Sequence, residues 1–354
     1  MKRIATPLMD LERTFELNLV RATEAASLNT FQWIGKGDKN QADQAASDAI
    51  RGVFDLIPVC GEVMIGEGIK DNAPGIFLGE QLGSWEVGSL KLDIAIDPID
   101  GTTNLSKGLP NSISVLAAAS PDQGEKNALR HLPSFYCQKL AYGPRVVAAM
   151  ESGRIKKLEL EAPIEKTLQQ IAQALDKRVQ DLVVVLLDRP RHDALVKSIR
   201  STGAAIRMIS DGDVAGAIAP ALIDASVDLY CGIGGSTEAV LAAAALRCLG
   251  GHIIVKMWPR DEAERKELIK AGHGKDLDKV YHAEDMARGH SILFCATGIT
   301  DSPLLPGLKM IGNHAITHSI VMRAKHRTVR FIKSYHDLTM KTIRLRSDRS
   351  DHKL

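Results

Sequence analysis

The chain has 354 residues, of which 45% are hydrophobic and 25% are charged, and its 45 lysines and arginines nearly balance its 43 aspartates and glutamates. This composition is typical of a soluble globular protein with about two domains and a large core. A formal net charge of +2, without a block of like charges, argues against a nucleic-acid-binding protein.

The cysteines and the N-terminal segment bear on where the protein works. Five cysteines are scattered without a CxxC motif, which predicts reduced thiols in a reducing compartment. Residues 1–20 lack the apolar core of a signal peptide, and no run approaches the roughly 18 apolar residues of a membrane span. We therefore expect a cytoplasmic protein without a membrane partner.

Helical and strand patterns both occur in the first 155 residues. Apolar residues at helical spacing predict an amphipathic N-terminal helix, and they are Leu8, Leu11, Phe15, Leu19 and Ala22. A second helix is predicted to begin near Gln41. Apolar runs predict strands at 63–68, 92–97, 113–120 and 144–150. The run at 92–97 has no polar alternation, which indicates a strand buried on both faces.

Strands and helices alternate more regularly after residue 155. Strands are predicted at 181–188, 204–210 and 225–235, and helices from about Arg191, at 237–251 and in the charged segment 261–280. Basic residues after Arg323 interleave with apolar ones, which predicts strands with one solvated face through Val329, Phe331, Ile332, Ile343 and Leu345. The alternation indicates an α/β protein with a boundary near 155, whose last strands could pack back on the first domain.

The segment 92–104, LDIAIDPIDGTTN, has two aspartates three residues apart at the end of an apolar strand. Asp97 would leave the strand where open α/β sheets have their sites. Pro98 would turn the chain so that Asp100 and the Ile99 carbonyl face the same point.

The two residues that follow strengthen this interpretation. Gly101 permits a close backbone approach, and Thr102 would begin a helix whose free amide groups could receive an anion. Converging carboxylate, carbonyl and hydroxyl oxygens suit Mg²⁺ or Mn²⁺, and two such ions about 3.5–4 Å apart could share one carboxylate. The alternative is a turn in which an aspartate caps a helix.

Three further acids occupy turns beside glycines or lysines. Glu67 lies between two glycines at a predicted strand end, and Asp38 lies between Lys36 and Lys39 in GKGDKN. Glu238 follows the glycines of GIGGSTEA, in the first turn of a predicted helix whose amide groups could receive a phosphate. The alternatives are a surface turn for Glu67, a helix cap for Asp38 and helix-dipole stabilisation for Glu238.

A cationic cluster follows the predicted strand 181–188. Arg189, Arg191 and His192 lie together in DRPRHDA, and arginine suits a phosphate through forked hydrogen bonds. The alternative is a surface salt-bridge cluster in which His192 only caps or packs.

An acidic turn follows the predicted strand 204–210. Asp211 and Asp213 flank Gly212 in SDGDVAG and could accept hydrogen bonds from hydroxyl groups. The alternative is a simple turn. The segments for nucleotide binding (GxxxxGK[ST]) and for a serine nucleophile (GxSxG) are absent, as is a histidine pair at zinc spacing.

The octapeptide DPIDGTTN resembles the metal-binding signature of the lithium-sensitive, metal-dependent phosphatases. Six further segments are similar, in the same order, to the bacterial class II fructose-1,6-bisphosphatase family: GKGDKNQAD, MIGEGIKDNAPGIFLGE, RPRHDAL, ISDGDVAGAI, YCGIGGSTEAV and FCATGIT. The resemblance extends from about residue 12 to about residue 345. It implies a layered αβαβα sugar-phosphatase sandwich with two sub-domains, 1–155 and 156–354, and the active site between them.

The resemblance also implies an activity, a cofactor and a set of site residues. The activity is removal of the 1-phosphate of fructose 1,6-bisphosphate in gluconeogenesis by a homo-oligomer, a dimer or tetramer, with two or more Mg²⁺ or Mn²⁺ ions. Asp38 and Glu67 would bind one metal and take part in catalysis, and Asp97, Asp100 and Glu238 would bind another. Thr102 would orient the attacking water. The sugar and its second phosphate would contact Asp100, Gly101, Thr102, Tyr136, Arg189, Pro190, Arg191, Asp211, Gly212, Asp213 and Gly235.

Two positions depart from the family's usual pattern. The family usually has glutamate at the position of Asp100, and Ala-Pro at the position of Ser236-Thr237. Asp100 is the residue that inositol monophosphatases have, and it is one methylene shorter. Three alternatives therefore stay open: a sedoheptulose 1,7-bisphosphatase, an inositol-monophosphatase-like enzyme, or a catalytically silent phosphate-binding regulatory subunit, although all five acids are present.

Overall fold

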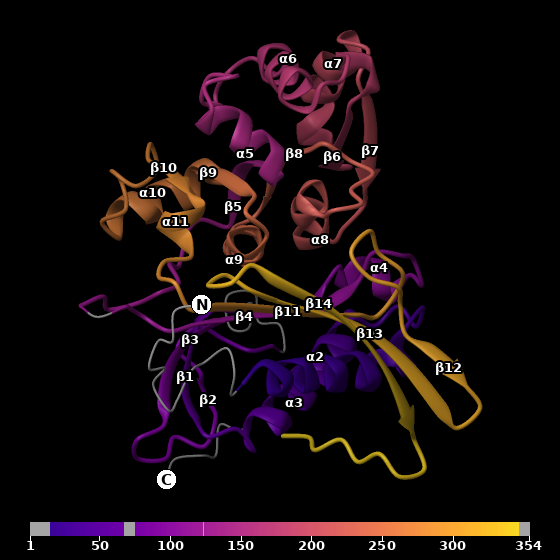
Figure 1. The fold of residues 1–354 in the computed structure, drawn as a ribbon. Coiled ribbons are helices and arrows are strands. Elements are labelled where there is room, and N and C mark those ends of the chain that lie inside the picture. Colours follow the sequence, from indigo (N-terminus) through magenta and orange to yellow (C-terminus); the bar gives the residue numbers. More distant parts are fainter. Residues whose placement is uncertain (1–14, 67–74, 123, 347–354) are drawn as a thin grey trace, which may run out of the picture.

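The computed structural model describes residues 15–66, 75–122 and 124–346. These residues form two mixed β-sheets, each with helices packed on it (Figure 1). The protein is therefore of the α/β class that the strand and helix patterns predict. No helix in the described part of the chain has the length and apolar character needed to cross a bilayer.

The first sheet has eight strands from both ends of the chain. Its order is β12-β13-β11-β4-β3-β1-β2, and β14 pairs with the free side of β13. The strands are β1 (Val59–Ile65), β2 (Gln81–Leu82), β3 (Leu90–Asp100), β4 (Ile113–Ala119), β11 (Ile292–Gly298), β12 (Lys309–Ile311), β13 (His314–Arg323) and β14 (Thr328–Asp337).

The second sheet has six strands from the middle of the chain, in the order β10-β9-β5-β8-β6-β7. The strands are β5 (Tyr136–Tyr142), β6 (Val183–Leu187), β7 (Ala205–Ile209), β8 (Leu229–Gly235), β9 (His252–Trp258) and β10 (Val280–His282). The chain thus passes to the second sheet after β4 and returns to the first after β10. The predicted division at residue 155 stays a prediction.

The helices pack on the sheets in distinct groups (Figure 1). Helices α2 (Glu16–Thr30) and α3 (Lys39–Phe54) cover one face of the first sheet, and α9 (Ser236–Leu249) lies between the two sheets. The others are α4 (Thr102–Ser106), α5 (Pro144–Glu151), α6 (Ile164–Leu175), α7 (Asp193–Ser201), α8 (Asp213–Ile218), α10 (Glu262–Lys270) and α11 (Ala283–Met286). Helix α9 contacts both sheets, which explains its nearly continuous run of buried small and apolar residues.

Strand β3 confirms the prediction of a strand buried on both faces. Ile94 and Ile96 pack in the core under α2 and α3, whereas Ala95 packs in the core between the sheets. Successive side chains point to opposite faces of a strand, so a run without polar alternation is required here.

Two sequence-based element predictions are wrong. Residues 144–150 form helix α5 instead of a strand, because Pro144 occupies its first position and the buried Val146 and Ala149 lie three residues apart on one helix face. Strand β14 contains the predicted Val329, Phe331 and Ile332, but Ile343 and Leu345 lie in an irregular segment beyond it. The predicted N-terminal helix begins at Glu16, and Leu8 and Leu11 lie outside the described residues.

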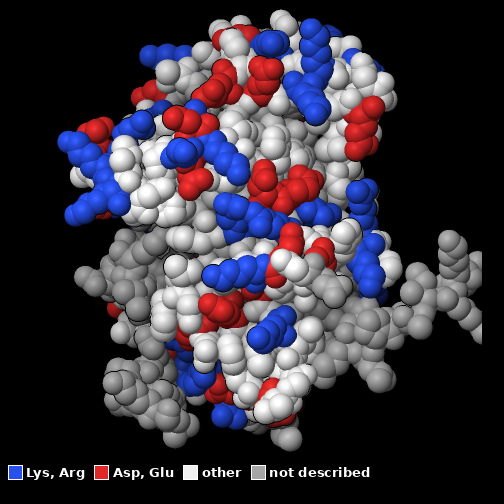
Figure 2. Space-filling view, turned by 90° about the vertical axis from the view of Figure 1, so that its left-hand side faces the viewer, with Lys and Arg blue, Asp and Glu red and all other residues white. Residues whose placement is uncertain are grey.

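The cysteines and the surface charge match two expectations from the sequence, which are reduced thiols and the lack of a block of like charges. None of the five cysteines, all of which lie in the described residues, forms a disulfide, and four of them are buried. On the face that Figure 2 shows, lysine and arginine side chains are interspersed with aspartate and glutamate, so no field of one sign dominates it.

Candidate active site

The two aspartates of the octapeptide lie at the end of β3, and both are buried. Asp97 is opposite Val115 of β4 and Asp100 is opposite Ile113, so three residues of β3 span two of β4. This β-bulge offsets the usual alternation, which would send side chains three apart to opposite faces. Both carboxylates consequently lie on the face of the first sheet that is turned toward the second sheet.

Gly101 and Thr102 follow the aspartates directly. Gly101 has a φ of +97°, and a Cβ there would lie 2.4 Å from the Asn111 carbonyl oxygen, so only glycine fits. Thr102 then begins α4, as its position after the strand predicts.

Asp100 connects the first sheet to α8, which packs on the second sheet. Its Oδ2 accepts hydrogen bonds from the backbone N–H groups of Val214 at 3.1 Å and Ala215 at 3.4 Å. Burial and, after it, nearby carboxylates beginning with Glu238 raise the pKa of Asp100 well above its ordinary value. The structure therefore brings acids from β3, α8 and α9 into one cluster.

Glu238 lies in the first turn of α9, as the sequence predicts. A Cβ at Gly235 would lie 1.9 Å from Glu238 Oε2, so the glycine makes room for this carboxylate. Burial raises the pKa of Glu238, and Lys139 opposes that effect.

The loop before α3 contains Asp38, which caps the helix by accepting a hydrogen bond from the Gln41 N–H at 3.0 Å. The cap was the alternative that the sequence left open, and a metal-binding role for this exposed side chain stays a prediction. Lys39 Nζ donates to Thr103 Oγ1 at 2.8 Å and so connects the start of α3 to α4. Glu67 lies outside the described residues, directly after Gly66.

The sequence patterns missed Asp43 on α3. Its Oδ1 lies 3.1 Å from Thr102 Oγ1, which also lies 2.9 Å from the Ile99 carbonyl oxygen. Burial raises the pKa of Asp43 to about 7, although the Thr102 hydrogen bond lowers it. Asp43 follows Lys39 by four residues and therefore shares its helix face, a spacing that could have indicated it.

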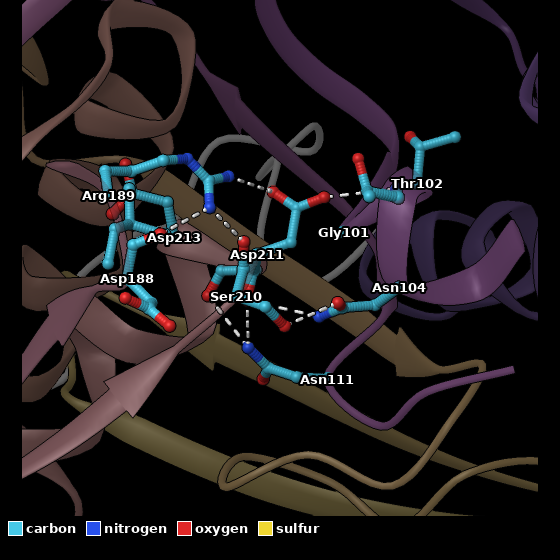
Figure 3. A network of polar contacts seen from close by, with 12 residues as sticks. Gly101, Thr102, Asn104, Asn111, Asp188, Arg189, Ser210, Asp211 and Asp213 are labelled. Atoms are coloured by element: carbon cyan, nitrogen blue, oxygen red, sulfur yellow. Dashed lines mark hydrogen bonds and ion pairs between the residues drawn. The ribbon is translucent and has the colours of Figure 1, made fainter. Parts of the chain in front are cut away.

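A polar network connects the loop after β7 to α4 (Figure 3). Arg189 Nη1 donates to the carbonyl oxygens of Asp188 at 2.9 Å and Ser210 at 2.7 Å, and its Nη2 lies 4.0 Å from Asp211 Oδ1. Asp211 Oδ2 accepts a hydrogen bond from the Thr103 N–H at 3.1 Å. Asp211 thus bridges the arginine and the start of α4.

Arg191 lies over an aromatic ring. Its guanidinium carbon is 4.5 Å from the centre of the Tyr136 ring, and its Nε and Nη2 donate to the Ile233 carbonyl at 3.2 and 2.8 Å. The neighbouring His192 is buried, contacts the Leu187 carbonyl through Nδ1 and accepts the Ile233 N–H through Nε2. Both ring nitrogens of His192 thus contact the backbone, which matches the alternative that this residue only caps or packs.

The other predicted residues of these turns have backbone roles. Pro190 begins the 3-10 helix η4 (Pro190–His192). Gly212 has a φ of +83°, and a Cβ there would lie 2.3 Å from Asn111 Nδ2, so a side chain would break the contact between the two halves.

A cavity of about 280 Å³ brings many of the predicted residues together. Its lining includes Tyr136, Arg189, Arg191, Asp211, Asp213, Gly235 and Glu238. Gly66, the residue before Glu67, lines it as well. The volume is near the lower end of the roughly 300–1,000 Å³ of small-molecule sites, and the charged lining suits an anionic, hydroxylated ligand.

The donor set fits a hard divalent cation. Within 15–66, 75–122 and 124–346, no three histidine, cysteine, aspartate or glutamate side chains are placed to hold a metal ion. The buried carboxylates of Asp97 and Asp100 and the half-buried carboxylate of Glu238 nevertheless supply only oxygen donors. Burial first, and then repulsion from Glu238, Asp211 and Asp213, raises the pKa of Asp100. A bound cation would relieve that repulsion.

Comparisons with known proteins give consistent matches. The family model of bacterial fructose-1,6-bisphosphatase, glpX-encoded, matches residues 13–336. The class 2 fructose-1,6-bisphosphatase of Haemophilus influenzae is 42% identical over 339 residues, which are 93% of this chain and 97% of that protein. A D-fructose 1,6-bisphosphatase class 2/sedoheptulose 1,7-bisphosphatase of Synechococcus sp. (strain JA-3-3Ab) is 37% identical over 348 residues. These are 92% of this chain and 96% of that protein.

Proposed function

Because the chain belongs to the bacterial, glpX-encoded fructose-1,6-bisphosphatase family, we propose that it hydrolyses the 1-phosphate of fructose 1,6-bisphosphate. One observation supports this most: the buried Asp100 at the end of β3 interacts electrostatically with Glu238, which lines a cavity with Arg191 and Tyr136. Acids for a metal and a cation for a second phosphate thus border one site. Sedoheptulose 1,7-bisphosphate is a second candidate substrate, since it appears in the name of the Synechococcus relative.

We infer that the architecture is the five-layered αβαβα sandwich that the resemblance implies. The packing of α2 and α3 outside the first sheet, and of α9 between the sheets, supports it. Helices α5, α6 and α7 share a buried core with the second sheet and would form the last layer. The active site would then lie where the two halves meet.

We propose that Mg²⁺ or Mn²⁺ serves the reaction, held by Asp97, Asp100 and Glu238, with Asp38 and Glu67 at a second position. When bound, such ions supply positive charge that stabilises the negative charge developing on the phosphoryl and leaving oxygens. Asp97 and Asp100 fit this role because both are buried on the face turned toward the second half.

The remaining residues position the water and the sugar. The Thr102 hydroxyl would orient the attacking water, and the ionised Asp43 would accept the proton that leaves through Thr102. As the water oxygen bonds to phosphorus, the ester P–O bond breaks, and the leaving sugar oxygen takes a proton from solvent. The products are fructose 6-phosphate and inorganic phosphate, with Arg191 and Arg189 holding the phosphate that does not react.

The direct test is phosphate release by the purified protein with Mn²⁺ or Mg²⁺. Fructose 1,6-bisphosphate, sedoheptulose 1,7-bisphosphate and inositol monophosphate are compared by kcat/KM. We expect a bisphosphate to be preferred by at least about tenfold, because a monophosphate has no second phosphate for Arg191 to bind. A preference for inositol monophosphate would contradict the proposal, and no turnover with any sugar would favour the regulatory-subunit alternative.

Arg191→Ala is expected to raise KM roughly tenfold and to change kcat less. A forked contact to the non-reacting phosphate acts on the ground state and the transition state alike. Steady-state kinetics measure both constants, and Arg200→Ala in the last turn of α7 is a matched control with an exposed arginine. An unchanged KM in Arg191→Ala would remove this residue from the substrate site.

Asp100→Glu is expected to keep the fold and part of the activity. The longer side chain would move its carboxylate past the amides of Val214 and Ala215, at a cost on the order of 1 kcal/mol for a lost helix-capping contact. Because Mg²⁺ demands near-ideal octahedral geometry, activity with Mg²⁺ should change more than activity with Mn²⁺. Metal titrations of the initial rate measure the difference.

Asp100→Ala is the companion variant and should lose nearly all activity with either ion. If it stayed active with the same metal requirement, Asp100 would be a turn residue alone.

The protein is also proposed to be cytoplasmic and homo-oligomeric. The absence of disulfides among the five described cysteines supports a reducing compartment. Light scattering coupled to size-exclusion chromatography measures the mass, and a value near 38.4 kDa would identify a monomer and contradict the dimer or tetramer.

A further inference from the structure

Lys139 on β5 is a buried cation that none of the sequence motifs contains. Its side chain is fully shielded from solvent. Among the described residues, only Arg51 and Lys139 are buried lysines or arginines, and Arg51 forms an ion pair with Glu80 on the outer side of the first sheet. A buried charge destabilises the fold unless it is paired, so the partner of Lys139 indicates what it is for.

That partner is Asp213, the first residue of α8. Lys139 Nζ donates to Asp213 Oδ2, and the Tyr230 hydroxyl donates to Asp213 Oδ1. Gly234 packs directly against the carboxylate, since a Cβ there would lie 1.9 Å from Oδ2. The second sheet therefore holds both oxygens of Asp213, although the residue borders the cavity.

The next two residues of α8 extend this connection to the first sheet. Val214 and Ala215 donate their N–H groups to Asp100 Oδ2. A continuous path thus leads from Lys139 on β5, through Asp213 and the first turn of α8, to the carboxylate of Asp100 at the end of β3. Any movement of Asp213 would move the two amides that orient Asp100.

We propose that Lys139 is a positioning residue, which fixes Asp213 and the start of α8 so that Asp100 is held in the orientation needed to bind a divalent cation. The proposal rests on the metal-binding role given to Asp100 in the proposed function. Groups that orient metal ligands without touching the metal typically change metal affinity roughly 10- to 100-fold when they are replaced.

A competing role for Lys139 predicts the opposite change in Mn²⁺ affinity when the lysine is replaced. If its charge merely offset the acid cluster, removing it would leave the site more negative and tighten the binding of Mn²⁺. If it positions Asp100, its removal loosens Mn²⁺ binding. Removing the charges of Lys139 and Asp213 together keeps the net charge constant and isolates the positioning effect.

The experiment titrates Mn²⁺ into the wild-type protein, Lys139→Met, and the double variant Lys139→Met/Asp213→Asn, by isothermal titration calorimetry. We expect the Kd for Mn²⁺ to rise at least about tenfold in the double variant, with kcat reduced. The control is Arg51→Met/Glu80→Gln, which removes the other buried ion pair. It should lower the melting temperature and leave the Kd for Mn²⁺ unchanged.

Tyr230→Phe provides a second, milder variant that leaves every charge in place. Losing one donor to Asp213 should raise the Kd for Mn²⁺ about threefold, in the same direction as the larger change. An unchanged or tighter Kd in the double variant, or in Tyr230→Phe if the double variant does not fold, would overturn the positioning role. Wild-type protein that binds Mn²⁺ but hydrolyses no sugar phosphate would instead contradict the proposed function and leave this inference standing.

Discussion

Replacing Asp97 with asparagine is expected to lower kcat at least about 100-fold while the fold persists. Asp97 is buried at the end of β3, and the amide would keep its size while removing the negative charge proposed to bind the metal. A 100-fold loss corresponds to about 2.7 kcal/mol of transition-state stabilisation, a modest share of what a metal supplies. Phosphate release at saturating Mn²⁺ measures it, and circular dichroism checks the fold.

Asp93→Asn is the matched control for this change. Asp93 lies four residues earlier on the same strand and the same face, where its carboxylate accepts hydrogen bonds from the N–H groups of Ala128 and Leu129. It should lose stability and keep kcat within about threefold, because the bonds it makes are structural. If Asp97→Asn kept more than about a tenth of wild-type activity, Asp97 would not be a principal metal ligand.

The second large effect is expected from Asp43→Asn, which should lower kcat roughly 100-fold. An asparagine can still accept a hydrogen bond from Thr102 but cannot take up its proton, and a positioned base typically contributes about 100- to 10,000-fold. Steady-state kinetics measure the loss. Asp48→Asn on the same helix, where the carboxylate accepts a bond from Gln44, is the control.

The pH dependence tests the same role of Asp43. Burial raises its pKa to about 7, so the carboxylate is ionised above that pH and protonated below it. Turnover should therefore fall as the pH drops, about tenfold per pH unit, with a midpoint no higher than about 7, since a bound cation favours the ionised form. This acid limb should disappear in Asp43→Asn, and a limb that persists unchanged would assign it to another group.

Much of the candidate site could be predicted from short segments, because their chemistry depends on immediate neighbours. The apolar run before Asp97 fixes a buried strand, and the glycines at 101 and 212 adopt a positive φ that other residues rarely accept. The wrong prediction at 144–150 has a different cause, because the local pattern there fits two structures. A short apolar run suits a strand or a helix, and the packing of α5 against α6 decided for the helix.

The sequence by itself thus determined the α/β class, the family and most of the acid and arginine residues that border the site. Only the tertiary structure decided the pairs that join distant segments: Asp43 with Thr102 across 59 residues, and Lys139 with Asp213 across 74. It also decided the bulge that turns Asp97 and Asp100 to one face, since that bulge exists only relative to β4. The physical reason is that backbone preference acts over a few residues, whereas strand pairing and buried charge pairs depend on which segments of the whole chain pack together.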